Sequence, residues 1–308
     1  MQKRKLSLFI AALTYSGNST GTSLIWPAAL WLIQTAVRLK TEEKFTSRIH
    51  DVRIQGYADT PVDMVRNHIV KEASQSGADV LIMLDSDMEP DCELRDDPDA
   101  VPFIDAAFDR IYSKWDDGPR FVAAPYGGTP PIENCFEFVW RKHGNVDHAP
   151  FELDQYHREE VVNLSGIQEA AAAPTGLIMY DMRCFPLIDP PYFSYEWTDG
   201  THTKKASTED VQNTRDISLA GCKQLGYNPV ECAWSSWAGH LKVWKVGRPL
   251  IYTADSVSKN LAQALSRPPL KERVVECSNF LESEFGKMDV IRLKDADGAE
   301  EKFKYQVC

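Results

Sequence analysis

A chain of 308 residues can bury a substantial core, and its 43% hydrophobic and 26% charged residues are typical of a globular rather than a disordered or fibrous protein. The formal net charge of −11 argues against a surface built broadly for polyphosphate backbones, because such surfaces rely on clustered Lys and Arg. The seven cysteines are scattered and form no CxxC pair, so their spacing suggests neither a disulfide framework nor a zinc cluster and favours a cytoplasmic location.

The first residues are basic and then apolar. Residues 3–5 read Lys-Arg-Lys, and the apolar run at 6–13 resembles part of a signal peptide, although it is short for one and a buried strand is favoured. Residues 24–37 are also apolar, but they contain Pro27 and Gln34 and are too few to span a bilayer. We therefore predict no transmembrane segment and no integral membrane association.

Strands and helices alternate in the first part of the predicted fold. In chain order they are a strand at 5–13, a helix at 23–39, a strand at 50–56, a helix from Pro61 to a stop at Gly77, and a strand at 79–84. Thr60 is placed to cap the second helix, and Pro61 suits its first position. The last strand is continuously apolar, as in parallel sheets covered on both faces, where ligands bind outside the carboxyl ends of the strands.

The rest of the chain is predicted to complete one domain at 1–248 and to add a small helical and hairpin appendage at 249–308. The remaining expected elements are a solvated acidic loop at 89–99, a helix at 101–114, strands at 120–124, 136–140, 176–180 and 229–233, a polar stretch without period at 141–168, a helix at 209–225 opened by Ser207-Thr208, one or two helices from 250 onward, and a hairpin around 295–298.

Two carboxylates directly follow the strand at 79–84. Asp85 and Asp87 flank Ser86, so both would face one side if the strand continued through them. Like charges this close repel unless a cation lies between them, and hard oxygen ligands suit Mg²⁺ or Mn²⁺ on a pyrophosphate. The same residues could instead form a turn or cap a helix.

Other candidates are individually weak. Glu209-Asp210 begins a predicted helix, where acids are stabilised by free amides and the helix dipole without any catalytic role. His240 lies among tryptophans and lysines, where a histidine is usually structural but becomes a metal ligand beside a cation. Arg66 on a helix and Thr14-Tyr15 after the first strand are ordinary unless a ligand lies above the sheet.

The order of these motifs resembles the GT-A fold glycosyltransferases, particularly family 2, over about residues 5–248. The motifs are Thr14-Tyr15, Arg66-Asn67, Asp85-Ser86-Asp87, Thr175-Gly176, Glu209-Asp210 and Gly239-His240. The resemblance implies an α/β fold with a mostly parallel, Rossmann-like sheet between helices, followed by a C-terminal α+β appendage. It also implies a metal-dependent enzyme that moves a sugar from a UDP- or GDP-sugar to an acceptor hydroxyl, inverting by direct displacement.

The resemblance further implies a role for each residue. Asp87, His240 and Asp85 would hold Mn²⁺ or Mg²⁺, with Asp87 as the main carboxylate ligand. Asp210 would be the catalytic base, with Glu209 as the second choice. The residues expected to contact the donor are Thr14, Tyr15, Asp59, Arg66, Asp85, Ser86, Thr175, Gly176 and Lys242.

Two departures from the family pattern are visible. The second strand ends in Gly56-Tyr57-Ala58-Asp59-Thr60 rather than an Asp-Asp-Gly-Ser run, which leaves Asp59 as the substitute. No Gln-x-x-Arg-Trp segment follows the acidic pair, which indicates a single-transfer enzyme. Two alternatives stay open: a sugar nucleotidyltransferase, although residues 16–23 lack the Lys or Arg of its basic loop, and a catalytically inactive carbohydrate or nucleotide-sugar binding protein.

The acceptor is the least determined partner, because many molecules present a hydroxyl. A saccharide is favoured, with a protein or a modified nucleic-acid base as alternatives, and the net charge disfavours nucleic acid. The irregular residues 141–168 and the appendage at 249–308 are where we expect acceptor contacts.

Overall fold

The computed structural model describes residues 4–14, 24, 26–58, 61–127, 140–143, 152–156, 158–161, 163–197, 205–241, 289–294 and 300–305. The chain divides into two compact units. The first consists of Met1–Gly127 and Phe136–Leu241, and the second consists of Gly128–Cys135 and Lys242–Cys308.

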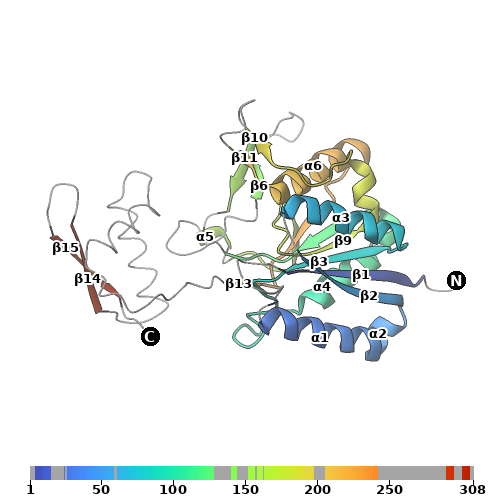
Figure 1. Ribbon diagram of the computed structural model, residues 1–308, viewed down its shortest axis with the longest axis horizontal. Helices are drawn as coiled ribbons and strands as arrows, with labels where there is room; N and C mark the ends of the chain where they lie inside the picture. Colours follow the sequence, from blue (N-terminus) through green and yellow to red (C-terminus); the bar gives the residue numbers. More distant parts are fainter. Residues whose placement is uncertain are drawn as a thin grey trace. The chain divides into compact units, whose positions relative to one another are not determined.

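A seven-stranded mixed sheet forms the centre of the first unit, in the order β2-β1-β3-β9-β5-β12-β8 (Figure 1). The bounds are Leu6–Thr14 for β1, Ile49–Ala58 for β2, Val80–Asp85 for β3, Phe121–Ala123 for β5, Ile167–Glu169 for β8, Leu177–Asp181 for β9 and Val230–Ala233 for β12. Strands β2, β1, β3, β5 and β12 share one direction, whereas β9 and β8 run against their neighbours. The expected α/β class with a mostly parallel sheet is therefore confirmed.

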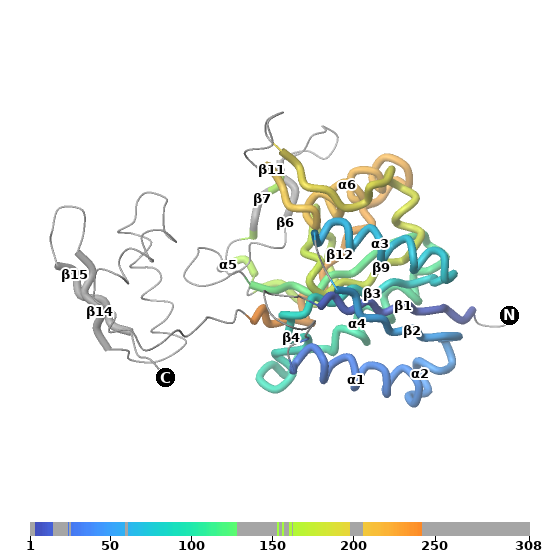
Figure 2. The backbone as a smooth tube through the Cα atoms, viewed as in Figure 1, coloured from blue at the N-terminus to red at the C-terminus, as the bar shows by residue number. Residues whose placement is uncertain are grey.

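Helices cover both faces of this sheet. Their bounds are Trp26–Thr41 for α1, Glu43–Thr46 for α2, Val62–Gln75 for α3, Phe103–Ser113 for α4, Arg158–Val161 for α5 and Glu209–Gln224 for α6, with 3-10 turns at Trp115–Asp117 and Met182–Leu187. The backbone trace shows α1 and α4 on one face and α3 and α6 on the other (Figure 2). None of the described helices combines the length and the apolar composition that a bilayer crossing requires.

The alternation of side chains along β1 explains the two layers of core. Leu8, Ile10 and Ala12 pack in the cluster that includes α1 and α4, whereas Phe9 and Ala11 pack in the cluster that includes α3. All of them are nearly inaccessible to solvent. Successive residues of a strand point to opposite faces, so a continuously apolar strand needs cover on both sides.

Two predicted helix starts differ from the structure. Helix α1 begins at Trp26 rather than at residue 23, with Pro27 in the first turn, where its missing N–H breaks no helical hydrogen bond. For α3 the N-cap is Pro61 and not the first helical residue, and no side chain caps this end. Thr60, the predicted cap, lies outside the described residues.

Short antiparallel ladders supplement the main sheet. Met88–Glu89 (β4) pairs with Gly239–His240 (β13), Glu196–Trp197 (β10) with Lys205–Ser207 (β11), and Trp140–His143 (β6) with Glu152–Gln155 (β7). The segment at 89–99 was predicted to be a solvated loop, but it is solvated only in part. The Asp91 carboxylate accepts hydrogen bonds from Trp31 Nε1 at 2.8 Å and from Phe103 N at 2.6 Å. This acidic stretch is therefore packed against α1 and α4.

The second unit contains an antiparallel pair of strands, Asp289–Lys294 (β14) and Glu300–Tyr305 (β15). The pair flanks the hairpin turn predicted at 295–298, which itself lies outside the described residues. The helices expected from residue 250 onward, and residues 136–139 of another predicted strand, also lie outside them.

Candidate functional site

Several predicted site segments meet where β1 and β3 end. Leu13 pairs with Asp85 in the parallel ladder, so Thr14 and Asp85 are neighbours at the carboxyl edge. Gly176 joins them because β9 is antiparallel and starts at this edge, and its carbonyl accepts a 2.8 Å hydrogen bond from Asp85 N. The Thr14 hydroxyl donates to the Tyr57 carbonyl at 2.8 Å. This is the edge at which open α/β sheets bind ligands.

The two aspartates do not continue one strand, contrary to the expectation from alternation. Strand β3 ends at Asp85, and Ser86 and Asp87 form a turn before β4. The β4–β13 ladder then pairs Met88 with His240, and Leu241 N donates to the Asp87 carbonyl at 2.8 Å. A backbone ladder, rather than side-chain packing alone, thus brings the histidine motif to the second aspartate.

The Asp87 and His240 side chains are in direct polar contact, at a separation that a hydrogen bond and a shared divalent ion both allow. Asp87 Oδ2 and His240 Nε2 lie 3.1 Å apart. Two ligand atoms at right angles around an ion, each bonded at about 2.1 Å, would be about 3.0 Å apart. Across the described residues, no three His, Cys, Asp or Glu side chains converge on one ion position. Mg²⁺ typically takes only one or two protein carboxylates and completes its shell with phosphate oxygens and water, so two protein ligands suffice.

Arg66 joins the strand end to the acidic pair. Its side chain is only 3% exposed, and Nη2 donates to Asp85 Oδ1 and Oδ2 at 3.1 and 2.9 Å while Nη1 donates to Glu209 Oε1 at 2.7 Å. Burial disfavours the charged guanidinium, but Asp85, Asp210 and Glu209 outweigh it and hold the pKa of Arg66 above its usual value. The guanidinium, which was predicted to contact the donor, is therefore engaged by two carboxylates of the protein itself.

The two acids of the Glu209-Asp210 pair have different surroundings. Helix α6 begins at Glu209, with Thr208 as an N-cap whose side chain makes no capping bond. Glu209 is 6% exposed, and burial raises the pKa of its carboxyl group in spite of Arg66. Asp210 is half-buried, and its Oδ1 accepts a hydrogen bond from Val211 N at 2.9 Å. Asp210 is thus the more accessible carboxylate of the two.

Among the described residues, carboxylates outnumber basic groups at this edge of the sheet. Burial raises the pKa of Asp85, Arg66 lowers it, and Asp87 and Asp210 raise it further. Three carboxylates, those of Asp85, Glu209 and Asp210, act on the Arg66 guanidinium, and Asp87 acts on Asp85. Such an excess repels anions unless a cation balances it.

Tyr126 is a site residue that the sequence did not single out. It is 5% exposed and hydrogen-bonds to the Gly176 backbone, and its ring centroid lies 5.1 Å from that of His240 at an interplanar angle of 70°. Burial, together with Asp210 and Asp85, raises the pKa of the phenol well above its usual value, so the hydroxyl keeps its proton. The residue follows β5, and its place after a parallel strand was the available signal.

Gly176 is required by the closeness of its neighbours. A Cβ at this position would lie 2.9 Å from Met88 Sδ and 2.9 Å from both Cε1 and the hydroxyl of Tyr126. Beside it, Thr175 is fully buried, and its hydroxyl has no hydrogen-bond partner among the described residues. The other predicted contacts Tyr15, Asp59 and Lys242 lie outside the described part of the chain.

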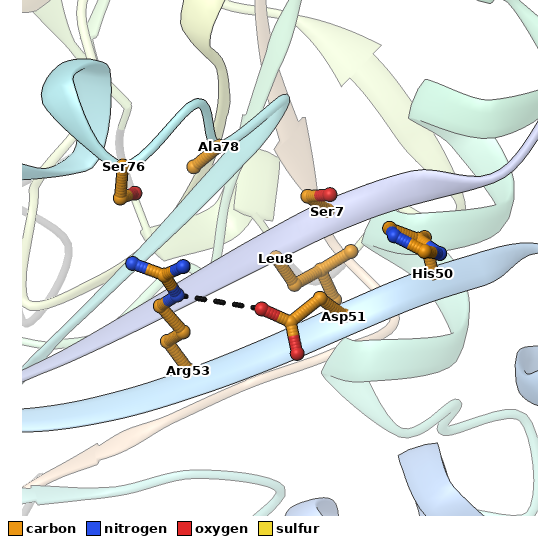
Figure 3. Close-up of a pocket in the computed structure, with 7 residues that line it drawn as sticks. All are labelled: Ser7, Leu8, His50, Asp51, Arg53, Ser76 and Ala78. Carbon is orange, nitrogen blue, oxygen red and sulfur yellow. Dashed lines mark hydrogen bonds and ion pairs between the residues drawn. The ribbon is translucent and has the colours of Figure 1, made fainter.

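A cavity of about 370 Å³ lies at the opposite end of the same strands (Figure 3). It is lined by Ser7, Leu8, His50, Asp51, Arg53, Ser76 and Ala78. Arg53 Nε donates to Asp51 Oδ2 at 3.3 Å across it. These residues lie at the amino ends of β1 and β2 and after α3, so none of the predicted site residues contributes to this cavity.

Comparison with solved structures finds distant structural likenesses. No protein-family model and no curated protein matches the chain. Among solved structures, A197 from STIV gives a TM-score of 0.45 at 14% identity, over 77% of this chain and 87% of that one. GalNAc-T7 with UDP, GalNAc and Mn²⁺ gives 0.41 at 13% identity, over 93% of this chain and 61% of that one, so the chain spans less than two thirds of it. A 4-diphosphocytidyl-2C-methyl-D-erythritol synthase gives 0.30 at 11% identity, over 80% and 94%.

Proposed function

We propose that the protein is a metal-dependent glycosyltransferase that moves a sugar from a UDP- or GDP-sugar to an acceptor hydroxyl, with inversion. The observation that carries this proposal is the 3.1 Å approach of Asp87 to His240 beside an excess of carboxylates, where the parallel strands end. A nucleoside diphosphate is an anion and would be repelled by these carboxylates alone. Asp87 and His240 would hold a divalent ion here, and its charge would offset this repulsion.

Asp87 and His240 are the residues that would hold Mn²⁺ or Mg²⁺. When bound, the ion neutralises charge on the departing nucleoside diphosphate. Asp85 stays oriented by its two hydrogen bonds from Arg66, which leaves it as a fixed acceptor for donor hydroxyl groups. The backbone ladder between β4 and β13 keeps the two metal-binding side chains in register without substrate.

Asp210 is the group that we assign to proton removal from the acceptor. Glu209 is engaged by Arg66 and nearly excluded from solvent, whereas Asp210 is partly accessible at the start of the same helix. A general base must reach the hydroxyl that it deprotonates, so accessibility decides between the two carboxylates. Arg66 thereby acts as a positioning residue, since it fixes the helix end that presents Asp210.

The experiment that tests this function is donor turnover with water as the acceptor, because it does not require the natural acceptor. The purified protein is incubated with a panel of UDP- and GDP-sugars and Mn²⁺, and release of nucleoside diphosphate is measured. We expect slow release that chelation abolishes. Pyrophosphate release from nucleoside triphosphates and sugar 1-phosphates would instead identify a nucleotidyltransferase. Binding of nucleotide-sugars without any turnover would identify a binding protein.

A further inference from the structure

A short segment before α6 is fixed from two sides. On the α3 side, Asn67 Nδ2 donates to the Phe193 carbonyl at 2.7 Å, and Phe193 N donates back to Asn67 Oδ1 at 3.2 Å. On the α6 side, Asn213 Nδ2 donates to the Tyr192 carbonyl at 2.8 Å. Both asparagines use side-chain amides to pair with backbone groups, which fixes the backbone at Tyr192 and Phe193.

The same segment is fastened to the helix that presents Asp210. The Glu196 carboxylate accepts two hydrogen bonds from Arg215, at 2.7 and 2.6 Å, and the Tyr195 hydroxyl bonds to Glu209. Arg215 and Glu209 both belong to α6. A bidentate Arg–carboxylate pair fixes orientation as well as distance. The ribbon that contains Glu196 therefore keeps a defined position relative to the acidic pair.

An exposed tryptophan stands on this fixed ribbon. The Trp197 side chain is 39% exposed, and its ring centroid lies 6.4 Å from that of Tyr195. In the β10–β11 ladder Trp197 pairs with Lys205, and the chain then runs from β11 directly into α6 (Figure 2). A large aromatic ring that is partly exposed on an anchored ribbon offers a preorganised surface for another ring.

We propose that Trp197 is the acceptor platform of the enzyme and that it stacks on a sugar ring of a saccharide acceptor. This assignment rests on the proposed glycosyltransferase function and adds the acceptor class and the residue that binds it. A sugar ring has an apolar C–H face and a hydroxyl rim, which matches an aromatic ring on a ribbon whose residues include the polar Ser194, Glu196 and Ser207.

Two other acceptor classes fit this ribbon less well. A lipid surface calls for a contiguous apolar patch, whereas the residues around Trp197 are polar. A nucleic acid calls for a cluster of basic side chains. Lys205 pairs with Trp197 in the ladder, but Arg215 is already bonded to the carboxylates of Glu196 and Asp216. The saccharide is therefore the occupant that the local chemistry favours.

The test separates acceptor binding from donor chemistry. Transfer to a panel of methyl glycosides and short oligosaccharides is measured for the parent and for Trp197→Ala, together with donor hydrolysis by water. We expect the KM for the saccharide to rise about 10-fold in Trp197→Ala, with hydrolysis unchanged. Trp197→Phe should recover most of the affinity because it keeps a ring. Trp26→Ala removes a 70% exposed tryptophan from α1 and serves as the matched control.

The outcomes distinguish this proposal from the function on which it rests. Normal hydrolysis with an unchanged saccharide KM in Trp197→Ala would contradict the acceptor role of Trp197 and leave the proposed glycosyltransferase function standing. Transfer to vesicles or oligonucleotides but to no saccharide also overturns it. A parent protein that hydrolyses no nucleotide-sugar removes the proposed function and the platform with it, whereas a selective loss in Trp197→Ala that Trp197→Phe restores supports both.

Discussion

Asp87 and His240 are separated by 153 positions in the chain, yet Asp87 Oδ2 and His240 Nε2 lie 3.1 Å apart. The contact is imposed by the backbone, because the residues that follow Asp87 pair with Gly239 and His240 in a short antiparallel ladder. The metal site that we propose here would need little rearrangement before an ion binds. Preorganised ligands lower the cost of binding.

Replacing Arg66 should destabilise the fold strongly. Arg66→Met leaves the buried Glu209 and the half-buried Asp85 without their cationic partner, and breaking a buried ion pair costs about 3–5 kcal/mol. The free energy of unfolding from urea titration measures the loss. Arg53→Met, which removes an exposed arginine beside Asp51, is the control and should cost less than about 1 kcal/mol. Equal stabilities of the two variants would contradict the buried bridge.

Replacing Asp210 should affect chemistry more than donor binding. We expect Asp210→Asn to lower the transfer rate by about 10² to 10⁴-fold, the usual contribution of a general base, with little change in the Kd of the nucleotide-sugar. Single-turnover kinetics and equilibrium binding measure the two quantities separately. A variant that binds the donor normally and transfers at the parental rate would rule out Asp210 as the base.

Adding one methyl group at Gly176 should disturb the site. In Gly176→Ala the new Cβ would lie 2.9 Å from Met88 Sδ and from the Tyr126 ring, and overpacking of this kind costs about 1–3 kcal/mol. Gly56→Ala is the matched control, because a Cβ there has no neighbour within 4 Å. Thermal or urea unfolding compares the two variants. If both variants are as stable as the parent, the result contradicts the close packing described around Gly176.

Acid should weaken the attachment of the β10–β11 ribbon to α6. Hydrogen bonds from Arg215 lower the pKa of Glu196 from 4.5. A carboxyl group with a lower pKa in the folded state stabilises the fold above its unfolded pKa, and this contribution is lost as the pH falls through the folded value. In Glu196→Gln the free energy of unfolding should therefore fall less steeply below about pH 5, by about 0.5–1 kcal/mol in total. Identical pH profiles for parent and variant would contradict this contribution.

Local signals in the sequence were enough to predict most of the central sheet. The apolar run at 79–84 and the turn residues around it predicted β3 to within one residue, because both signals depend on adjacent positions. The motif order also predicted that Asp85, Thr14 and Thr175-Gly176 would meet, and they do so at one edge. In a mostly parallel sheet the carboxyl ends of the strands lie at one edge, so residues that follow different strands come together there.

The motif resemblance placed Asp87 and His240 around one ion, but the backbone pairings that bring them together left no local signal in the sequence. The two-residue strands β4 and β13 are too short to leave a periodic pattern, and only their pairing brings His240 to Asp87. Arg66 reads as a surface arginine, since burial of a charge depends on partners that are distant in the chain. Tyr126 carries no motif at all, and its position depends on how β5 and β9 pack.

The most direct test of the central claim is the Mn²⁺ dependence of nucleotide-sugar hydrolysis in the parent, in Asp87→Asn and in the distant control Asp51→Asn. The assignment of Asp87 and His240 as the ion-binding pair predicts that the parent and Asp51→Asn release nucleoside diphosphate with the same Mn²⁺ dependence, whereas Asp87→Asn needs at least about 10-fold more Mn²⁺ or shows no activity. Hydrolysis that is independent of divalent ions, or an Mn²⁺ dependence that Asp87→Asn leaves unchanged, would contradict it.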